Sequence, residues 1–215
     1  MNFSEIALSL LSGFGNTLIL FAVTLIFALP LGFIICFGSR SRFKPLKYFV
    51  KGVIWIIRGT PLMLQIIVIF YIPGLWFGTP FQSRLLAACI AFILNYACYF
   101  AEIFRGGLDS VSNGQYEACK VLGLTRTQTF FRVILMQVVK NIVPPLGNEI
   151  ITLVKDTSLA NIIIVEELIF EANQIQKVYG ILSPLFVAGL FYLIFNGLIQ
   201  FLLSRAEKKL SYYKI

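Results

Sequence analysis

The 215-residue sequence contains no histidine and only four cysteines, and these scarcities exclude several kinds of chemistry. Nucleophilic triads that use histidine as their base and HExxH zinc sites both require the missing side chain. The cysteines form no CxxC pair, so neither a zinc site nor a dithiol redox centre is expected. We therefore expect neither a metal nor a cofactor bound in this chain.

Charge is also scarce. Only 13% of the residues are charged, whereas 58% are hydrophobic and the mean hydropathy is +0.85. A soluble domain ordinarily has about 25% charged residues, because polar groups must cover much of its surface. The composition therefore predicts a membrane protein. No low-complexity run or long linker interrupts the sequence, so a single transmembrane domain is expected over residues 1–215.

Five apolar segments are long enough, or nearly long enough, to span a bilayer, which requires about 20 residues of helix. They are Leu11–Phe37, Val53–Ile72, Leu85–Phe104, Pro144–Val165 and Leu182–Leu203. The sequence thus predicts an all-α integral membrane protein with five transmembrane helices. The first segment is longer than the hydrocarbon layer, so either it tilts or Gly13 and Gly15 mark its outer boundary.

Lysine and arginine gather in three parts of the sequence. Residues 40–51 hold five of them, residues 105–140 hold five more, and the tail after residue 204 holds four. All three groups lie on the cytoplasmic side if the chain starts outside, crosses five times and ends in the cytoplasm, as the positive-inside rule requires. This topology explains the net charge of +8, and no nucleic-acid partner is expected.

The segment between the third and fourth predicted spans, about residues 110–137, is unusually polar for this chain. Two capping boxes, Ser112–Gln115 and Thr125–Gln128, each indicate a helix start. Gly123 lies between them, where a left-handed helix C-terminus is expected. The pattern predicts two short helices joined by a sharp turn, with the second running toward the membrane. The alternative is a surface helix that packs on its own bundle.

The same segment has a motif of a known family. Glu117-Ala118-Cys119 is followed by Gly123, then by nine residues, and then by Val133-Ile134-Leu135-Met136. This resembles the EAA loop of ABC importer permeases. The sequence departs from the family pattern at Cys119, where alanine is usual, at Val133, where isoleucine is usual, and at Met136. Met136 replaces a proline, whose ring would constrain the helix at that point.

Further blocks resemble the polar amino acid subgroup of these permeases, and they follow that subgroup's order over most of the chain. They are RGTPL at 58–62, AEIFRGG at 101–107, PPLGNE at 144–149 and KDTSL at 155–159. The resemblance implies a type I ABC importer permease fold and the transport of an amino acid. The rival interpretation, an ion-coupled secondary transporter or channel subunit, lacks the support of a visible inverted repeat.

The resemblance also implies partners. It implies ABC ATPase subunits, a second permease subunit that is identical or different, an extracytoplasmic amino acid-binding protein and a prokaryotic cell membrane. This sequence lacks the GxxxxGK[ST] loop that cradles phosphates, so we expect ATP and Mg²⁺ on the partner ATPase and no enzymatic activity here. In the motif, Glu117 is expected to contact the ATPase, Ala118 and Cys119 to keep the helix thin, and Gly123 to make the turn.

Polar residues inside apolar spans are the candidates for a substrate path, because such groups face a protein interior or a wet cavity. The candidates are Arg58, Thr60, Pro61, Asn95, Asp156 and Ser158. Arg58 offers a donor for the carboxylate of an amino acid, and Asp156 offers an acceptor for its ammonium group. The structural alternatives are that Lys155 and Asp156 each pair with charges elsewhere in the bundle and that Thr60 and Pro61 only start a helix. Polar, basic and sulfur-containing amino acids all remain open.

Overall fold

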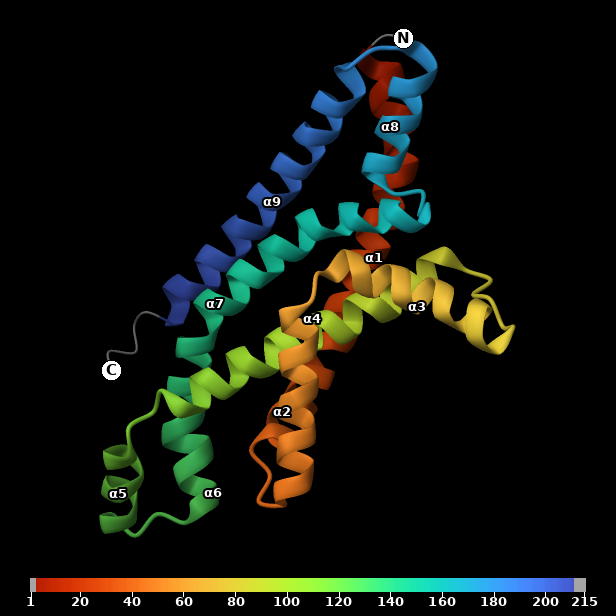
Figure 1. Ribbon diagram of the computed structural model, residues 1–215. Coiled ribbons are helices and arrows are strands. Elements are labelled where there is room, and N and C mark those ends of the chain that lie inside the picture. The colour runs from red at the N-terminus through yellow and green to blue at the C-terminus, as the bar shows by residue number, and fades with distance from the viewer. Residues whose placement is uncertain (1–2, 211–215) are drawn as a thin grey trace.

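The computed structural model describes residues 3–210, and within that range it contains helices and connections but no strand (Figure 1). The elements are α1 (Phe3–Ser39), α2 (Lys44–Gly59), α3 (Leu62–Phe77), α4 (Arg84–Asp109), α5 (Asn113–Val121), α6 (Arg126–Thr129), the π-helical η1 (Phe130–Ile134), α7 (Leu135–Asp156), the 3-10 helical η2 (Thr157–Ile163), α8 (Leu168–Tyr179) and α9 (Ser183–Leu210). The predicted all-α class is confirmed.

Four helical segments among residues 3–210 are long and apolar enough to cross a membrane, and the bent pair α2–α3 makes a fifth if it counts as one span. The first and third predicted spans fall within α1 and α4, and the fifth matches α9 except for Leu182, which precedes the helix. The prediction Pro144–Val165 begins too late, because the helical segment that holds nearly all of it runs from Arg126 to Ile163. Hydropathy hides the start of α7, since polar side chains such as the buried Gln137 lie in its first turns.

Helix α1 runs along α4 and also contacts α2 and α8 (Figure 1). Its 37 residues form one helix that Gly13 and Gly15 do not interrupt. A β-carbon on Gly13 would lie 2.7 Å from Cγ of Glu171 and 2.8 Å from the carbonyl oxygen of Glu167. Gly13 therefore permits α8 to pack closely on α1.

Helices α2 and α3 meet at an angle of 107°, so the predicted span over Val53–Ile72 consists of two helices with a sharp break between them. Thr60 is extended, with φ −116° and ψ 145°, as expected of a residue that precedes proline. Pro61 has no N–H with which to continue α2. Gln65 bridges the break, because its Nε2 donates to the carbonyl of Ile57 at 2.7 Å and to Oγ1 of Thr60 at 2.9 Å.

The main core lies where α4 packs between α1 and α3. Small side chains on α4 are fully buried there, namely Ala87, Ala88, Ala91 and Ala97. On the facing side of α1, a β-carbon on Gly32 would lie 2.9 Å from the carbonyl oxygen of Ala97 and 2.9 Å from Cβ of Phe100. Small residues at helix contacts let backbones approach closely, which stabilises helix packing where the hydrophobic effect is absent.

Helix α8 is an element that the sequence interpretation did not predict. Its N-cap is Glu167, a fully buried carboxylate that accepts hydrogen bonds from the N–H groups of Ile169 at 2.8 Å and Phe170 at 2.7 Å. The hydroxyl of Tyr192 on α9 donates to the same carboxylate at 3.3 Å. Burial raises the pKa of Glu167 to about 7. One side chain thus caps α8 and ties it to α9.

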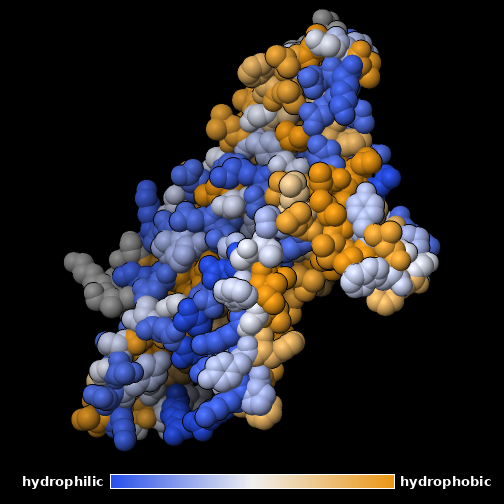
Figure 2. All heavy atoms as spheres, viewed as in Figure 1, coloured by the Kyte–Doolittle hydropathy of each residue, from blue (hydrophilic) through white to orange (hydrophobic). Residues whose placement is uncertain are grey.

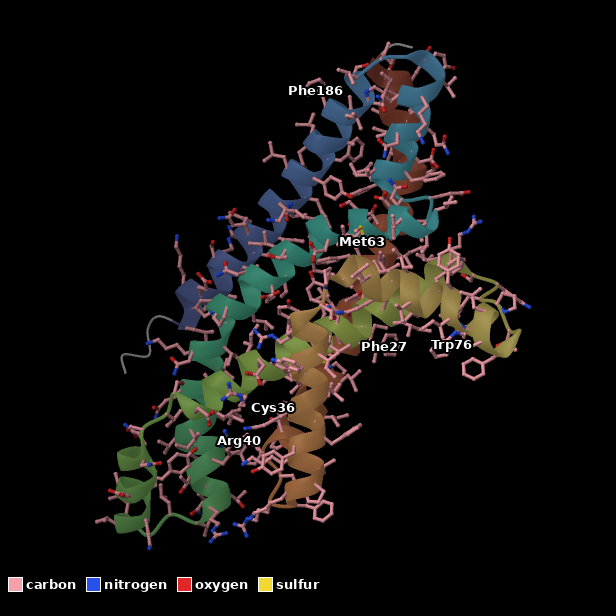
Figure 3. The ribbon with its side chains drawn as sticks, viewed as in Figure 1. Phe27, Cys36, Arg40, Met63, Trp76 and Phe186 are labelled. Carbon is pink, nitrogen blue, oxygen red and sulfur yellow. The ribbon has the colours of Figure 1, made fainter. Side chains whose placement is uncertain are left out.

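The surface fits a lipid environment. Figure 2 shows hydrophobic side chains gathered over α3 and the neighbouring middle of the molecule, and hydrophilic ones at the end that bears α5 and α6. Large apolar side chains such as Phe27 on α1 and Trp76 on α3 are exposed and point away from the ribbon (Figure 3). The N-terminus lies at the opposite end of the molecule from α5 and α6 (Figure 1).

Candidate functional site

Helices α5 and α6 form a helix–turn–helix at one end of the molecule (Figure 1). Gly123 has a left-handed backbone, with φ +71°. The N–H of Leu124 donates to the carbonyl of Cys119 at 3.0 Å, and the N–H of Gly123 donates to the carbonyl of Lys120 at 3.1 Å. These two bonds define a Schellman C-cap. The predicted left-handed turn at Gly123 is confirmed.

The two predicted capping boxes have different outcomes. At α6 the box is complete, because the N–H of Gln128 donates to Oγ1 of Thr125 at 3.3 Å and the N–H of Thr125 donates to Oε1 of Gln128 at 2.9 Å. At α5 the box is wrong, since the N-cap Ser112 makes no side-chain cap hydrogen bond. Oε1 of Gln115 instead accepts from Nε2 of Gln137 on α7, at 3.5 Å, and so ties α5 to α7.

The EAA-like residues divide between two faces of α5. Glu117 and Ala118 are exposed, whereas Cys119 is buried against the rest of the chain. At the end of α5, Val121 and Leu122 are 87% and 76% exposed. Exposed apolar side chains beside a carboxylate form a surface suited to contact with another protein. Glu117, Ala118 and the tip of α5 are therefore available to a partner.

The α5–α6 segment is fixed to the ends of α4 and α7. Val111, Ile134 and Val138 form a buried apolar cluster between these elements. Nδ2 of Asn141 on α7 donates to Oγ of Ser110 at the end of α4, at 2.7 Å. A displacement of α5 relative to the body would therefore act directly on α4 and α7.

The helix runs without interruption from α6 through η1 into α7. Met136 lies in the first turn of α7, and the helix has no break there. Directly before it, Phe130–Ile134 forms a π-helical turn, a feature that occurs often at functional sites of helices. The position where the family has proline is thus continuous helix in this chain.

A cavity of about 480 Å³, here called the path cavity, lies between the α2–α3 break, α4 and α7. Its lining includes five of the six candidate residues, namely Arg58, Thr60, Pro61, Asn95 and Asp156. Ser158 lies outside it. The Ser158 hydroxyl donates to the carbonyl of Lys155 at 2.7 Å, and this residue lines a separate cavity of about 370 Å³ beside Met63.

Other residues of the path cavity were not among the candidates. Tyr96 on α4 donates its hydroxyl to Oδ2 of Asp156 on α7 at 2.7 Å, and Glu149 and Thr152 complete the α7 wall. Glu149 had a signal in the sequence, because a carboxylate inside an apolar span is itself a functional hypothesis. Tyr96 had none, since tyrosine is common in membrane proteins and its contact with α7 depends on the fold.

The charges of the path cavity are a guanidinium and two carboxylates. Arg58 lies with its guanidinium carbon 5.0 Å from the centre of the Tyr99 ring. Asp156 makes no ion pair within 4 Å among residues 3–210, so the alternative that it pairs with a charge elsewhere in the bundle is not observed there. Glu149 likewise has no ion pair or side-chain hydrogen bond within the part of the chain that the structure describes. The cavity therefore presents one positive and two negative groups to a small polar ligand.

Comparison with known proteins places this geometry in context. Residues 28–212 match the family described as the binding-protein-dependent transport system inner membrane component. The chain belongs to this family. The membership confirms the resemblance noted in the sequence, and it does not favour the secondary transporter or channel interpretation.

Two relatives of this permease family span nearly the same length. The L-cystine transport system permease protein TcyB of Bacillus subtilis (strain 168) is 37% identical over 94% of this chain and 86% of its own length. The arginine transport system permease protein ArtQ of the same organism is 33% identical, over 94% of this chain and 92% of its own length.

Solved structures of permeases have the same fold. A chain from the crystal structure of an amino acid ABC transporter with histidines superposes with a TM-score of 0.88 at 30% identity, covering 97% of this chain and 99% of that one. A chain from the inward-facing MetNI methionine ABC transporter superposes with a TM-score of 0.70 at 19% identity, over 98% of this chain and 99% of that one. The importer permease fold is thereby confirmed for this chain.

Proposed function

We propose that this permease is the transmembrane subunit of an ATP-driven amino acid importer, forming the translocation path and docking a separate ATPase through its EAA-like loop. The observation that carries the proposal is the path cavity, which sets the guanidinium of Arg58 opposite the carboxylates of Asp156 and Glu149. An amino acid carries both a carboxylate and an ammonium group, and this arrangement offers each of them a partner of opposite charge.

The path cavity also favours one class of amino acid. Two carboxylates face one guanidinium, so after a zwitterion has bound, one negative group is left over. An additional cationic group on the substrate would match it. We therefore propose substrates that carry a second ammonium or a guanidinium. The name of the relative ArtQ, which refers to arginine, agrees with this proposal because arginine has such a group without a second carboxylate.

Coupling to ATP is assigned to the exposed face of α5. Glu117 and Ala118 would contact the ATPase, while the buried Cys119 and the left-handed turn at Gly123 would hold α5 in place. The partners are ABC ATPase subunits that bind ATP and Mg²⁺, a second permease subunit and an extracytoplasmic amino acid-binding protein. The N-terminus would lie outside and the C-terminus in the cytoplasm of a prokaryotic cell, with the chain in its plasma membrane.

Reconstitution with the cognate ATPase and binding protein tests the proposal. Uptake of labelled arginine, cystine and glutamine into proteoliposomes is measured for the wild type, Asp156→Asn and the exposed control Glu207→Gln. We expect Asp156→Asn to raise KM for the transported amino acid by about tenfold, the effect of losing one charged hydrogen bond in a site, and the control to leave KM unchanged. Uptake kinetics that Asp156→Asn leaves intact would refute the assigned path.

The coupling assignment has its own experiment. Glu117→Lys is compared with Glu207→Lys for co-purification of the ATPase and for ATP hydrolysis stimulated by the loaded binding protein. We expect Glu117→Lys to lose both while the apparent Tm of the permease is unchanged. Stimulated hydrolysis at the wild-type level in Glu117→Lys would contradict the docking role.

A further inference from the structure

A second cavity, of about 530 Å³, lies between α2 and α4 and adjoins the path cavity. The two cavities share Arg58, Gly59 and Tyr99. The remaining lining of this α2–α4 cavity comes from earlier turns of α2, including Lys51, and from the later turns of α4, including Arg105. The start of α2 and the end of α4 both lie toward the α5–α6 segment (Figure 1), here called the coupling loop. The α2–α4 cavity therefore lies on the coupling-loop side of the path cavity.

The charge of the α2–α4 cavity is opposite to that of the path cavity. Lys51, Arg58 and Arg105 line it together with a single carboxylate, Glu102. Glu102 is already occupied, because Arg105 donates to it from Nε at 3.0 Å and from Nη2 at 2.7 Å. Arg58 and Lys51 therefore leave positive charge without a matching carboxylate. A small anion is the ligand that this surface attracts.

Arg58 lies at the boundary of the two cavities and is held only loosely. Its Nη1 is 3.7 Å from Oε2 of Glu102, which is too long for a hydrogen bond, and its guanidinium makes no hydrogen bond to residues 3–210. The Tyr99 ring, 5.0 Å away, is its other contact, and the side chain is 41% exposed. A guanidinium held in this way can change partner without breaking a strong bond, so it can follow a carboxylate from one cavity into the other.

We propose that the α2–α4 cavity is a second binding station for the carboxylate of the transported amino acid and that Arg58, stacked on Tyr99, is the latch between the two stations. The proposal rests on the proposed transport function. In the path cavity the substrate binds through its ammonium to Asp156 and through its carboxylate to Arg58. When the Arg58 side chain moves toward the coupling loop, Lys51 and Arg58 together bind the substrate carboxylate in the α2–α4 cavity.

Cysteine accessibility tests the station and the latch separately. The four native cysteines are all buried, so a thiol reagent reacts mainly with a single introduced, accessible cysteine. Inside-out vesicles that contain the whole transporter expose the coupling-loop side to reagent. The reagents are an anionic sulfonatoethyl and a cationic trimethylammonium-ethyl methanethiosulfonate. Cysteine modification reports access whether or not the complex transports, so failure here is distinguishable from failure of the proposed function.

The station is probed by Trp55→Cys, on an exposed residue of the α2–α4 cavity. We expect the anionic reagent to react faster than the cationic one, and Lys51→Gln to slow the anionic reaction by roughly threefold to tenfold, as the loss of one nearby charge implies. Lys47→Gln is the matched control, because Lys47 lies one turn earlier on α2 and outside the cavity lining, and it should have no such effect. A rate that Lys51→Gln leaves unchanged, or no reaction at all, would overturn the station.

The latch is probed by Thr152→Cys, on the α7 wall of the path cavity. Tyr99→Ala removes the ring against which Arg58 stacks and is expected to raise the rate of modification from the coupling-loop side by about tenfold or more. Tyr99→Phe keeps the ring and should leave the rate unchanged. An apparent Tm close to the wild-type value in both backgrounds shows that the fold is intact. Equal rates at Thr152→Cys with and without Tyr99→Ala would overturn the latch.

Discussion

At Gly107 the backbone of α4 lies directly against α7, just before the coupling loop. A β-carbon there would overlap Cγ2 of Ile142 and lie 3.4 Å from Cγ1 of Val138. Ile142 is β-branched and has one strongly preferred χ1 rotamer in a helix, so Cγ2 cannot turn away without strain. The neighbouring Gly106 meets no atom within 4 Å of the same added carbon. Gly107→Ala and Gly106→Ala therefore form a matched pair that differs in packing.

The magnitude follows from two opposing contributions. Both variants gain about 1 kcal/mol of helix propensity, because alanine favours a helix interior over glycine. Only Gly107→Ala also suffers overpacking, which typically costs about 1–3 kcal/mol. The propensity gain cancels in the comparison, so Gly107→Ala should be less stable than Gly106→Ala by about 1–3 kcal/mol. For a chain of this size each kcal/mol corresponds to about 2–4 °C in Tm.

Thermal unfolding of the purified permease in detergent, at one heating rate for all variants, measures this difference. Ile142→Ala removes the atom that the new β-carbon meets, so Gly107→Ala should cost nothing further in that background. The double-mutant cycle thereby separates the contact from any general effect of alanine at the site. Equal apparent Tm values for Gly106→Ala and Gly107→Ala, or a penalty that persists beside Ile142→Ala, would refute the reasoning.

Three further predictions concern single contacts. Thr125→Ala removes the capping box of α6 and should cost about 1 kcal/mol, seen as faster amide hydrogen exchange in α6 but not in α9. Gln65→Leu leaves the broken end of α2 without its bridging donor and should cost about 1–3 kcal/mol in thermal unfolding, and an unchanged Tm would contradict the bridge. The folded pKa of Glu167, about 7, lies above the ordinary glutamate value of 4.5, so the native state binds this proton more tightly. Its contribution to the free energy of unfolding is therefore greatest below about pH 4.5, falls as the pH rises to about 7 and is constant above that. In Glu167→Gln this slope of Tm against pH should disappear, and a slope that persists would assign it to another group.

Local signals in the sequence predicted the fold class, three of the spans and the turn at Gly123, because each depends on a short pattern that no distant contact overrides. The 107° break had a local signal in Thr60 and Pro61, which the sequence allowed as a helix start, but hydropathy alone joined Val53–Ile72 into one span because apolar residues resume after Pro61. Helix α8 was not predicted, because a glutamate such as Glu167 is expected to be exposed from the sequence alone. Only the packing of α1 and α9 buries it as a helix cap. The path cavity was only partly predicted, since the contact of Tyr96 with Asp156 joins residues 60 positions apart.

Charged side chains of alternating sign form a series of ion pairs from the coupling loop to the path cavity. Asp109, at the end of α4 next to the coupling loop, pairs with Arg40, which directly follows α1, and with Arg105 at 2.9 Å. Arg105 pairs with Glu102 at 2.7 Å, and Glu102 lies 3.7 Å from Arg58 at the α2–α3 break. Exposed ion pairs of this kind contribute only about 0–1 kcal/mol each, so the series adds little to stability. Because each ion pair is weak, its side chains can change partners when the helices shift. A movement of α5 can therefore change the position of Arg58 through this series of ion pairs.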